Sequence, residues 1–195
     1  MGADDENLQV VEEVVAALTA LNIPYALGGS MASSLLGTPR FTQDADITAE
    51  PFPGKEADFV SRFGPDYYVS LPAVKDAVRQ RSSFNIIHID SGFKVDVFIR
   101  KDRLFEASVM ARRRPEPLAG RPQQSIMLVS PEDIILLKLE WYRMGNETSD
   151  RQWSDVLGVL KVRAGLLDEA YLDRWAAVLN VSDLLARARQ QVGAG

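Results

Sequence analysis

Residues 28–46, GGSMASSLLGTPRFTQDAD, decide the fold. The stretch opens with Gly28 to Ser30 ahead of a helix-like run, and a glycine-lined helix N-terminus offers bare backbone N–H groups that suit a phosphate. It closes with Asp44 and Asp46, whose carboxylates project to the same side of an extended segment. Because like charges that close repel each other, this pair indicates a hard divalent cation such as Mg²⁺. The stretch therefore carries the residues needed for chemistry on a nucleoside triphosphate.

A third carboxylate lies in the run FNIIHIDSGFKVDVFI, residues 84–99, which reads as two strands joined by a turn at Ser91. Alternation puts the valines of the second strand on one face and Asp96 on the other. Aspartate has a low strand propensity, so Asp96 needs a reason to be there. A local hydrogen bond at a strand end is one reason. In combination with Asp44 and Asp46, a shared metal site is the other.

The order of these motifs resembles the nucleotidyltransferase superfamily, which has the DNA polymerase β-like fold. Within it, the sequence is similar to the small bacterial nucleotidyltransferases, among them the type IV toxin and minimal nucleotidyltransferase families. The resemblance covers roughly the first hundred residues. It places the family's Gly-Ser motif on Gly29 and Ser30, its Asp-x-Asp motif on Asp44 and Asp46, and its third acidic residue on Asp96.

This resemblance implies a metal-dependent enzyme that moves a nucleoside monophosphate from an NTP to a hydroxyl acceptor and releases pyrophosphate. Asp44 and Asp46 are expected to bind Mg²⁺ or Mn²⁺, and Asp96 to complete the second metal site and help deprotonate the incoming hydroxyl. Residues Gly28 to Ser30 are expected to hold the triphosphate. In such a two-metal site the ions stabilise the attacking and leaving oxygens of an in-line displacement.

Lys138 interrupts the apolar run of residues 134–139. A buried ammonium without a partner is costly, so Lys138 is expected to reach solvent or meet an anion. The resemblance places here a lysine that contacts the triphosphate, and a lysine that snorkels to water is the alternative. Arg143, Arg151 and Asp155 follow in an order that resembles the family's. Arg151 and Asp155 are also spaced as an ordinary i, i+4 helix pair.

Length and composition limit the fold and the location. A chain of 195 residues can bury one core, or one domain with a helical appendage. We expect a nucleotidyltransferase core over residues 1–125 and a helical part packed on it over residues 126–195. No apolar run is long enough to span a bilayer, and no secretory signal is evident. The absence of cysteine excludes disulfides and thiolate chemistry and fits a cytoplasmic protein.

The expected elements add up to an α+β fold, a mixed sheet flanked by helices with a helical C-terminal part. Before residue 100, the patterns predict helices at 6–21, 56–63 and 72–78 and strands at 23–27 and 67–69, besides those named above. Residues 112–124, rich in Pro, Gly and Arg, predict a linker or a mobile loop. Helices then follow from Ser130, a candidate N-cap, with Gly145 as a candidate C-cap. Further helices are expected to begin near residues 149, 168 and 182.

The distribution of charge leaves the partner open. A net charge of −5 argues against a general nucleic-acid coat protein, although a local patch can hold an RNA substrate. Positive charge does gather in one stretch, where a solvated loop and a binding surface are both reasonable interpretations. This stretch contains Arg100, Lys101, Arg103, Arg112, Arg113, Arg114 and Arg121.

The single histidine, His88, is expected to be a hydrogen-bonding group in a strand beside the active site. Its spacing from Arg81 resembles the Arg and His pair of some small ribonucleases, whose motifs lie on helices. One histidine without cysteine excludes a zinc site or a cysteine-based triad.

The acceptor of the transfer is not fixed by these residues. A tRNA end, a protein hydroxyl and a small molecule such as an aminoglycoside all remain, and so do all four nucleotides. A nucleotide-binding regulator that has lost turnover is one alternative function. An interaction protein, half of a toxin–antitoxin pair with an antitoxin partner, is another.

Overall fold

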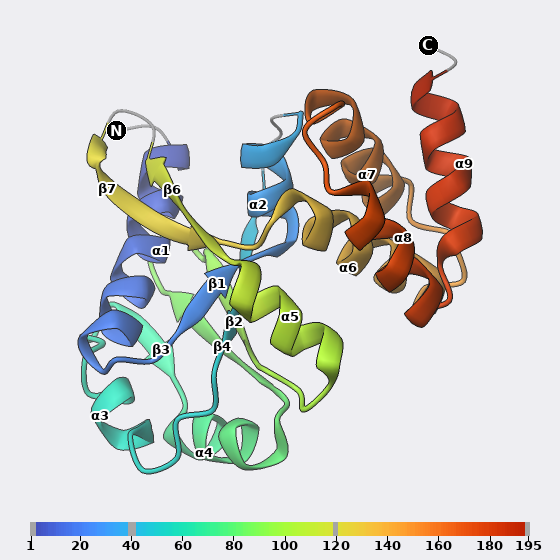
Figure 1. The fold of residues 1–195 in the computed structure, drawn as a ribbon. Helices are drawn as coiled ribbons and strands as arrows, with labels where there is room; N and C mark the ends of the chain where they lie inside the picture. Colours follow the sequence, from blue (N-terminus) through green and yellow to red (C-terminus); the bar gives the residue numbers. More distant parts are fainter. Residues whose placement is uncertain (1–2, 39–41, 119–120, 194–195) are drawn as a thin grey trace. The chain divides into compact units, whose positions relative to one another are not determined.

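The computed structural model describes residues 3–38, 42–118 and 121–193 (Figure 1). Its strands form one seven-stranded mixed sheet in the order β3-β4-β5-β2-β1-β7-β6. The chain clusters into two compact units, residues 1–28 with 41–128, and residues 29–40 with 129–195. The predicted α+β fold, a mixed sheet with flanking helices and C-terminal helices, is confirmed. The predicted division into residues 1–125 and 126–195 stays a prediction.

The first unit contains the sheet together with four helices among the described residues. Its strands are β1 (Tyr25–Leu27), β2 (Asp44–Ala49), β3 (Tyr67–Val69), β4 (Ser83–His88), β5 (Lys94–Ile99), β6 (Arg114–Leu118) and β7 (Arg121–Leu128). Its helices are α1 (Ala3–Ala20), α3 (Glu56–Val60), α4 (Leu71–Gln80) and α5 (Leu104–Arg112). The hairpin predicted around Ser91 is confirmed, because β4 and β5 pair antiparallel.

Two parallel strands, β2 and β5, form the centre of the sheet. Along both strands, buried and half-buried residues alternate strictly. Valine, isoleucine and alanine side chains fill the buried face, and the polar side chains of both strands share the opposite face. This is the period of two that the sequence pattern predicted for residues 84–99.

Aromatic and polar contacts join the helices of this unit to the sheet. Phe59 of α3 is fully buried, and its ring lies 5.9 Å from that of Phe84 of β4 in an edge-to-face arrangement. The Tyr67 hydroxyl of β3 donates a hydrogen bond of 2.6 Å to Glu13 of α1. Burial of the phenol is the main cause that raises the pKa of Tyr67, and this hydrogen bond to a carboxylate raises it further.

The predicted loop over residues 112–124 is wrong. Among its described residues, the chain completes α5, forms β6 and begins β7, and β6 pairs antiparallel with β7 (Figure 1). Pro115 and Pro117 lie two residues apart in β6, the last strand of the sheet. Proline cannot donate a ladder hydrogen bond and is tolerated in an edge strand, where one row of N–H groups has no strand to pair with. The prolines therefore mark an edge, not a break.

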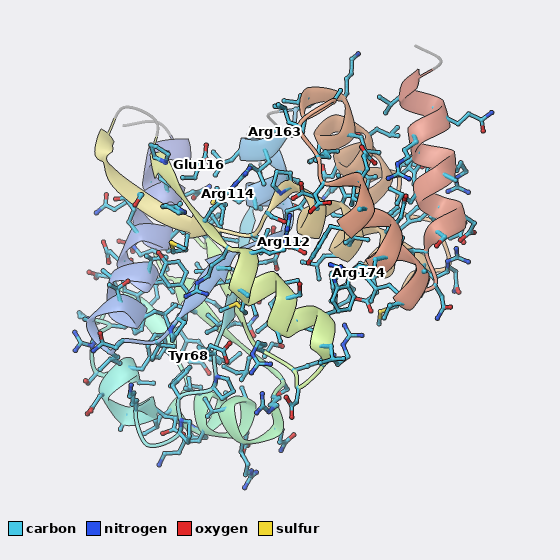
Figure 2. All side chains as sticks on the ribbon, in the orientation of Figure 1. Tyr68, Arg112, Arg114, Glu116, Arg163 and Arg174 are labelled. Carbon is cyan, nitrogen blue, oxygen red and sulfur yellow. The ribbon has the colours of Figure 1, made fainter. Side chains whose placement is uncertain are left out.

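The positive stretch is spread over several elements of the first unit. Figure 2 labels Arg112 at the end of α5 and Arg114 at the start of β6. Arg100, just after β5, donates from its Nε to both carboxylate oxygens of Glu50, at 2.7 and 2.8 Å. Arg103 pairs with Glu106 in the first turn of α5. Part of this charge is thus neutralised locally, which weakens the interpretation of the stretch as a binding surface.

The secondary-structure elements of the second unit, among its described residues, are all helices. Its helices are α2 (Gly29–Leu36), α6 (Pro131–Met144), α7 (Asp150–Val162), α8 (Glu169–Val178) and α9 (Ser182–Gly193). The predicted N-cap of α6 is confirmed, because the Ser130 hydroxyl accepts a hydrogen bond from the Asp133 amide. Gly145 caps the other end of the helix, as predicted. Buried Asp133 also accepts a hydrogen bond of 2.6 Å from the Tyr171 hydroxyl of α8.

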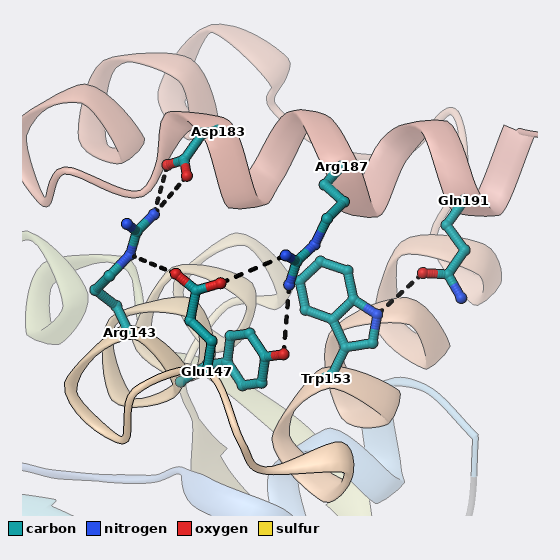
Figure 3. A network of polar contacts seen from close by, with 7 residues as sticks. Arg143, Glu147, Trp153, Asp183, Arg187 and Gln191 are labelled. Carbon is teal, nitrogen blue, oxygen red and sulfur yellow. Dashed lines mark hydrogen bonds and ion pairs between the residues drawn. The ribbon is translucent and has the colours of Figure 1, made fainter.

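A network of polar and ring contacts attaches α9 to α6, α7 and their connection (Figure 3). Arg143 at the end of α6 donates from its Nη2 to both carboxylate oxygens of Asp183, at 2.6 and 2.7 Å. The Arg187 guanidinium lies 4.1 Å from the centre of the Trp153 ring, a cation–π distance. The Trp153 indole N–H donates a hydrogen bond to Gln191. The C-terminal helix is therefore held by directional contacts as well as by buried leucines.

The chain just after α2 approaches α7 closely at two glycines, Gly37 and Gly158. A Cβ on Gly37 would lie 2.8 Å from the Val159 amide nitrogen and 3.0 Å from the Ser33 carbonyl oxygen. A Cβ on Gly158 would lie 3.1 Å from the Thr38 hydroxyl oxygen. Backbone atoms cannot move aside as a flexible side chain does, so Gly37 is required by the contact itself.

We expect Gly37→Ala to lower the free energy of unfolding by about 1–3 kcal/mol, because the added methyl group overpacks the α2–α7 contact. Urea unfolding followed by circular dichroism measures this. Gly64→Ala is the matched control, since no described atom lies within 4 Å of its added Cβ, and its effect should stay within about 0.5 kcal/mol. Equal stability of the Gly37 variant and the wild type would show that the two helices do not approach this closely.

Candidate active site

The three predicted carboxylates lie on one face of the first unit's sheet. Asp46 of β2 and Asp96 of β5 are direct partners in the parallel register, and Asp44 lies two residues before Asp46. All three belong to the half-buried face of their strands. Neighbouring strands are about 4.8 Å apart, and residues i and i+2 of a strand about 6.6 Å. We call Asp44, Asp46 and Asp96 the acidic triad.

Asp96 has two polar partners on the same face. Asn85 of β4, its direct partner across the antiparallel pair, donates a hydrogen bond to one carboxylate oxygen. Lys94 lies two residues earlier on β5, and its Nζ is 2.6 Å from the other oxygen. Asp96 thus has the local hydrogen bonds expected of a strand aspartate. It is also the register partner of Asp46 on the neighbouring strand.

Lys94 is the functional candidate that sequence reasoning missed. It is the direct register partner of Asp44, while its ammonium binds Asp96. The hydrogen bond to Asp96 raises the pKa of Lys94, partial burial opposes the rise, and the charges of Asp96, Asp44 and Asp46 add to it. The signal in the sequence was the Lys-x-Asp spacing, which puts both side chains on one strand face.

Asp44 is one of the residues that line a cleft. Its carboxylate accepts a hydrogen bond of 3.0 Å from the Thr42 hydroxyl. The cleft, with a volume of about 640 Å³, is lined by α1, by the start of β2 and by the β4–β5 turn. The lining residues are Glu6, Asn7, Gln43, Asp44, Ser91, Gly92, Phe93 and Lys94. One triad residue, Asp44, and its register partner Lys94 therefore both line this cleft.

His88 ends β4, at the turn that lines the cleft. Its Nδ1 lies 2.8 Å from the Ser91 hydroxyl and 4.0 Å from the Glu6 carboxylate. The ring also lies 5.2 Å from that of Tyr67. The prediction that His88 is a hydrogen-bonding group in a strand is confirmed.

The donor set fits a hard divalent ion in chemistry, because carboxylate oxygens are the ligands that Mg²⁺ and Mn²⁺ prefer. The acidic triad already attracts a cation, the ammonium of Lys94. Among the described residues, however, no three His, Cys, Asp or Glu side chains are gathered closely enough to hold a metal ion. The metal site at Asp44, Asp46 and Asp96 therefore stays a prediction, with ligands of the right kind on one face.

The residues of the predicted glycine turn, Gly28 to Ser30, differ in their positions and contacts. The Gly28 N–H donates a hydrogen bond of 2.8 Å to the Asp46 carbonyl oxygen, so it supports the strand that carries two triad residues. Its contact with a phosphate stays a prediction. Gly29 begins α2 with a φ of 57°, a left-handed conformation that favours glycine. Ser30 follows in the first turn of α2.

Lys138 meets an anion, one of the two outcomes that its sequence environment predicted. Its Nζ lies 2.7 Å from the Asp155 carboxylate of α7, and both side chains are almost fully buried. The Ser30 hydroxyl of α2 is 3.4 Å from the same Nζ. Ser30 and Lys138, two residues assigned to the triphosphate, thus lie together in the second unit. Asp155 pairs across helices, in addition to its i, i+4 spacing from Arg151.

No helix in the described part of the chain has the length and apolar character to cross a membrane.

Comparisons with known proteins identify the fold. Neither protein-family models nor curated protein sequences match this chain. Its structure is similar to a nucleotidyltransferase-like antigenic protein of Paracoccidioides brasiliensis, with a TM-score of 0.58 and 19% identity over 94% of this chain and 92% of that one. It is also similar to the antibiotic-resistance factor ANT(2'')-Ia, with a TM-score of 0.50 and 16% identity over 90% and 96% of the two chains. The fold is therefore nucleotidyltransferase-like.

Proposed function

We propose that this protein is a metal-dependent nucleotidyltransferase that moves a nucleoside monophosphate from an NTP to a hydroxyl acceptor. One observation carries the proposal: Asp46 and Asp96 are direct register partners on two neighbouring parallel strands, with Asp44 on the same face. Three carboxylates side by side on a half-buried surface repel one another, and divalent ions relieve that repulsion. The nucleotidyltransferase-like fold supports the same reaction class.

The reaction balances without a redox partner. The acceptor oxygen forms a bond to the α-phosphorus while the bond from that phosphorus to the bridging oxygen breaks. Pyrophosphate leaves with the bridging oxygen, and the acceptor's proton passes to a carboxylate. Asp96 is the proposed base, because the hydrogen bond from Asn85 fixes the orientation of its carboxylate.

Mg²⁺ or Mn²⁺, held by Asp44, Asp46 and Asp96, would supply charge neutralisation at the attacking and leaving oxygens when bound. For Gly29, Ser30 and Lys138 the proposed role is binding of the triphosphate. A hydroxyl and an ammonium are both phosphate ligands, and Ser30 and Lys138 are neighbours in the second unit. Gly28 is proposed to support this role only through the backbone, because its N–H is bonded to Asp46.

A label-transfer experiment tests the proposal. Purified protein is incubated with each α-labelled NTP in turn and with RNA, protein and low-mass fractions of the source cells. With Mg²⁺ or Mn²⁺ we expect label on one fraction, and with EDTA we expect none. The labelled fraction names the acceptor class, and the productive NTP names the nucleotide.

Nucleotide binding without transfer to any fraction would instead favour a regulator that keeps the fold without turnover. An antitoxin-like protein that silences the enzyme is proposed from the resemblance to type IV toxins alone. Co-purification from the source cells tests it, and a partner found there would be added back to the transfer assay.

A further inference from the structure

Lys94 brings a positive charge to the face that carries three negative ones. It is the cross-strand partner of Asp44, and its ammonium lies 2.6 Å from a carboxylate oxygen of Asp96. The charges of Asp44 and Asp46 act on the same ammonium. A cation in this position touches one proposed metal ligand and interacts with the other two.

A divalent ion and this ammonium compete for the same oxygens. A second cation at the Asp96 oxygen that binds Lys94 would lie close to the ammonium, and two positive charges that close repel each other strongly. A divalent ion at this oxygen therefore favours the departure of Lys94 from Asp96.

We propose that Lys94 is an internal counter-cation of the acidic triad, which neutralises Asp96 in the metal-free protein and is displaced when a divalent ion binds. This inference rests on the proposed function, because it assigns the metal to the same three carboxylates. Lys94 thereby sets how tightly the metal is held and keeps the three carboxylates stable side by side without it.

The surroundings of Lys94 allow the exchange. The side chain of Lys94 is 39% exposed and that of Asp96 17%, so solvent screens the ion pair in part and a stronger ligand of Asp96 can break it. The lysine also lines the cleft of about 640 Å³ next to Asp44, which offers a place for the displaced ammonium. The flexible four-carbon stem of lysine permits that movement without a change in the backbone.

The proposal predicts the direction of a metal-affinity change. If the metal binds only when Lys94 has left Asp96, the observed affinity is reduced by the fraction of molecules in that state. Lys94→Met keeps the length of the stem and removes the charge. We therefore expect this variant to bind Mn²⁺ roughly three- to tenfold more tightly than the wild type, without nucleotide.

Binding of Mn²⁺ to the full chain is measured from the electron paramagnetic resonance signal of the free ion, with calorimetry as a second method. Lys75→Met is the matched control, because it removes the same charge from an exposed position on α4 and should leave Mn²⁺ affinity unchanged. Asp96→Asn in the Lys94→Met background should weaken binding, which locates the ion at the triad. Lys94→Gln replaces the methionine variant if the latter does not fold.

Mn²⁺ binding that is equal or weaker in the Lys94 variants, while the wild type binds the ion, would overturn the counter-cation role and leave the proposed function standing. Equal tightening by Lys75→Met would also overturn it, because net charge alone would then explain the effect. Absence of Mn²⁺ binding in the wild type and in every variant would contradict the proposed metal chemistry as well. The two failures are therefore distinguishable.

Discussion

Replacing Asp46 with asparagine is expected to reduce nucleotidyl transfer by roughly three orders of magnitude, or about 4 kcal/mol of transition-state stabilisation. Asparagine has the shape of aspartate but no charge, so it cannot neutralise a divalent ion as a carboxylate does. Asp46 is also the direct partner of Asp96 in the β2–β5 register. The substitution therefore removes the central carboxylate of the triad while the strand pairing is kept.

The fold should survive this change. The Gly28 N–H bonds to the backbone oxygen of Asp46, not to its side chain, and that bond remains. The measurement is the initial rate of label transfer at saturating NTP, with circular dichroism as the check on folding. Asp90→Asn is the matched control, because Asp90 is an exposed aspartate in the β4–β5 turn and its loss should leave the rate unchanged. A folded Asp46→Asn variant with wild-type rates would contradict the proposed site.

Replacing Asp155 with alanine is expected to destabilise the protein by about 3–5 kcal/mol. The Lys138 and Asp155 side chains are only 6% and 5% exposed, and their charges are 2.7 Å apart. Removal of one partner leaves the other charge buried, where the long contact to Ser30 does not replace a carboxylate. The loss comes from the stranded ammonium and not from the ion pair itself.

A double variant separates these two contributions. Lys138→Met with Asp155→Leu removes both charges, so it should recover most of the lost stability. Urea unfolding of the wild type, Lys138→Met, Asp155→Leu and the double variant gives the coupling energy between the two side chains. Asp76→Ala, which breaks an exposed pair with Arg79, serves as the control and should cost about 1 kcal/mol or less. If Asp155→Ala lowered the free energy of unfolding by no more than this control does, Lys138 would have ready access to water.

Local patterns in the sequence predicted those features that depend on neighbours along the chain. The alternation around Asp96 gave its strand face correctly, because the period of two is a property of the strand alone. Ser130 was recognised as a helix cap because the cap, the proline and the acidic residues follow one another directly. The carboxylates were found for the same reason, although their roles stay predictions.

Features that depend on strand order or helix packing were not predictable in this way. The prolines of β6 suggested a loop, because their tolerance comes from a position at the sheet edge that the local sequence does not reveal. Lys94 was overlooked, because its place opposite Asp44 follows from the β2–β5 register. The i, i+4 spacing of Asp155 from Arg151 pointed to a partner on the same helix, whereas the contact of Asp155 with Lys138 depends on how α6 and α7 pack.

The membership of α2 in the second unit limits where the chain can be truncated or divided into fragments. The chain passes from one unit to the other after residues 28, 40 and 128, so no single cleavage separates them. A fragment that ends at residue 128 would keep α2 but lose α7, whose backbone packs against Gly37. Such a truncation would expose apolar surface of α2 to water. Recombinant expression of the sheet alone therefore requires an internal deletion of residues 29–40 with a short replacement linker.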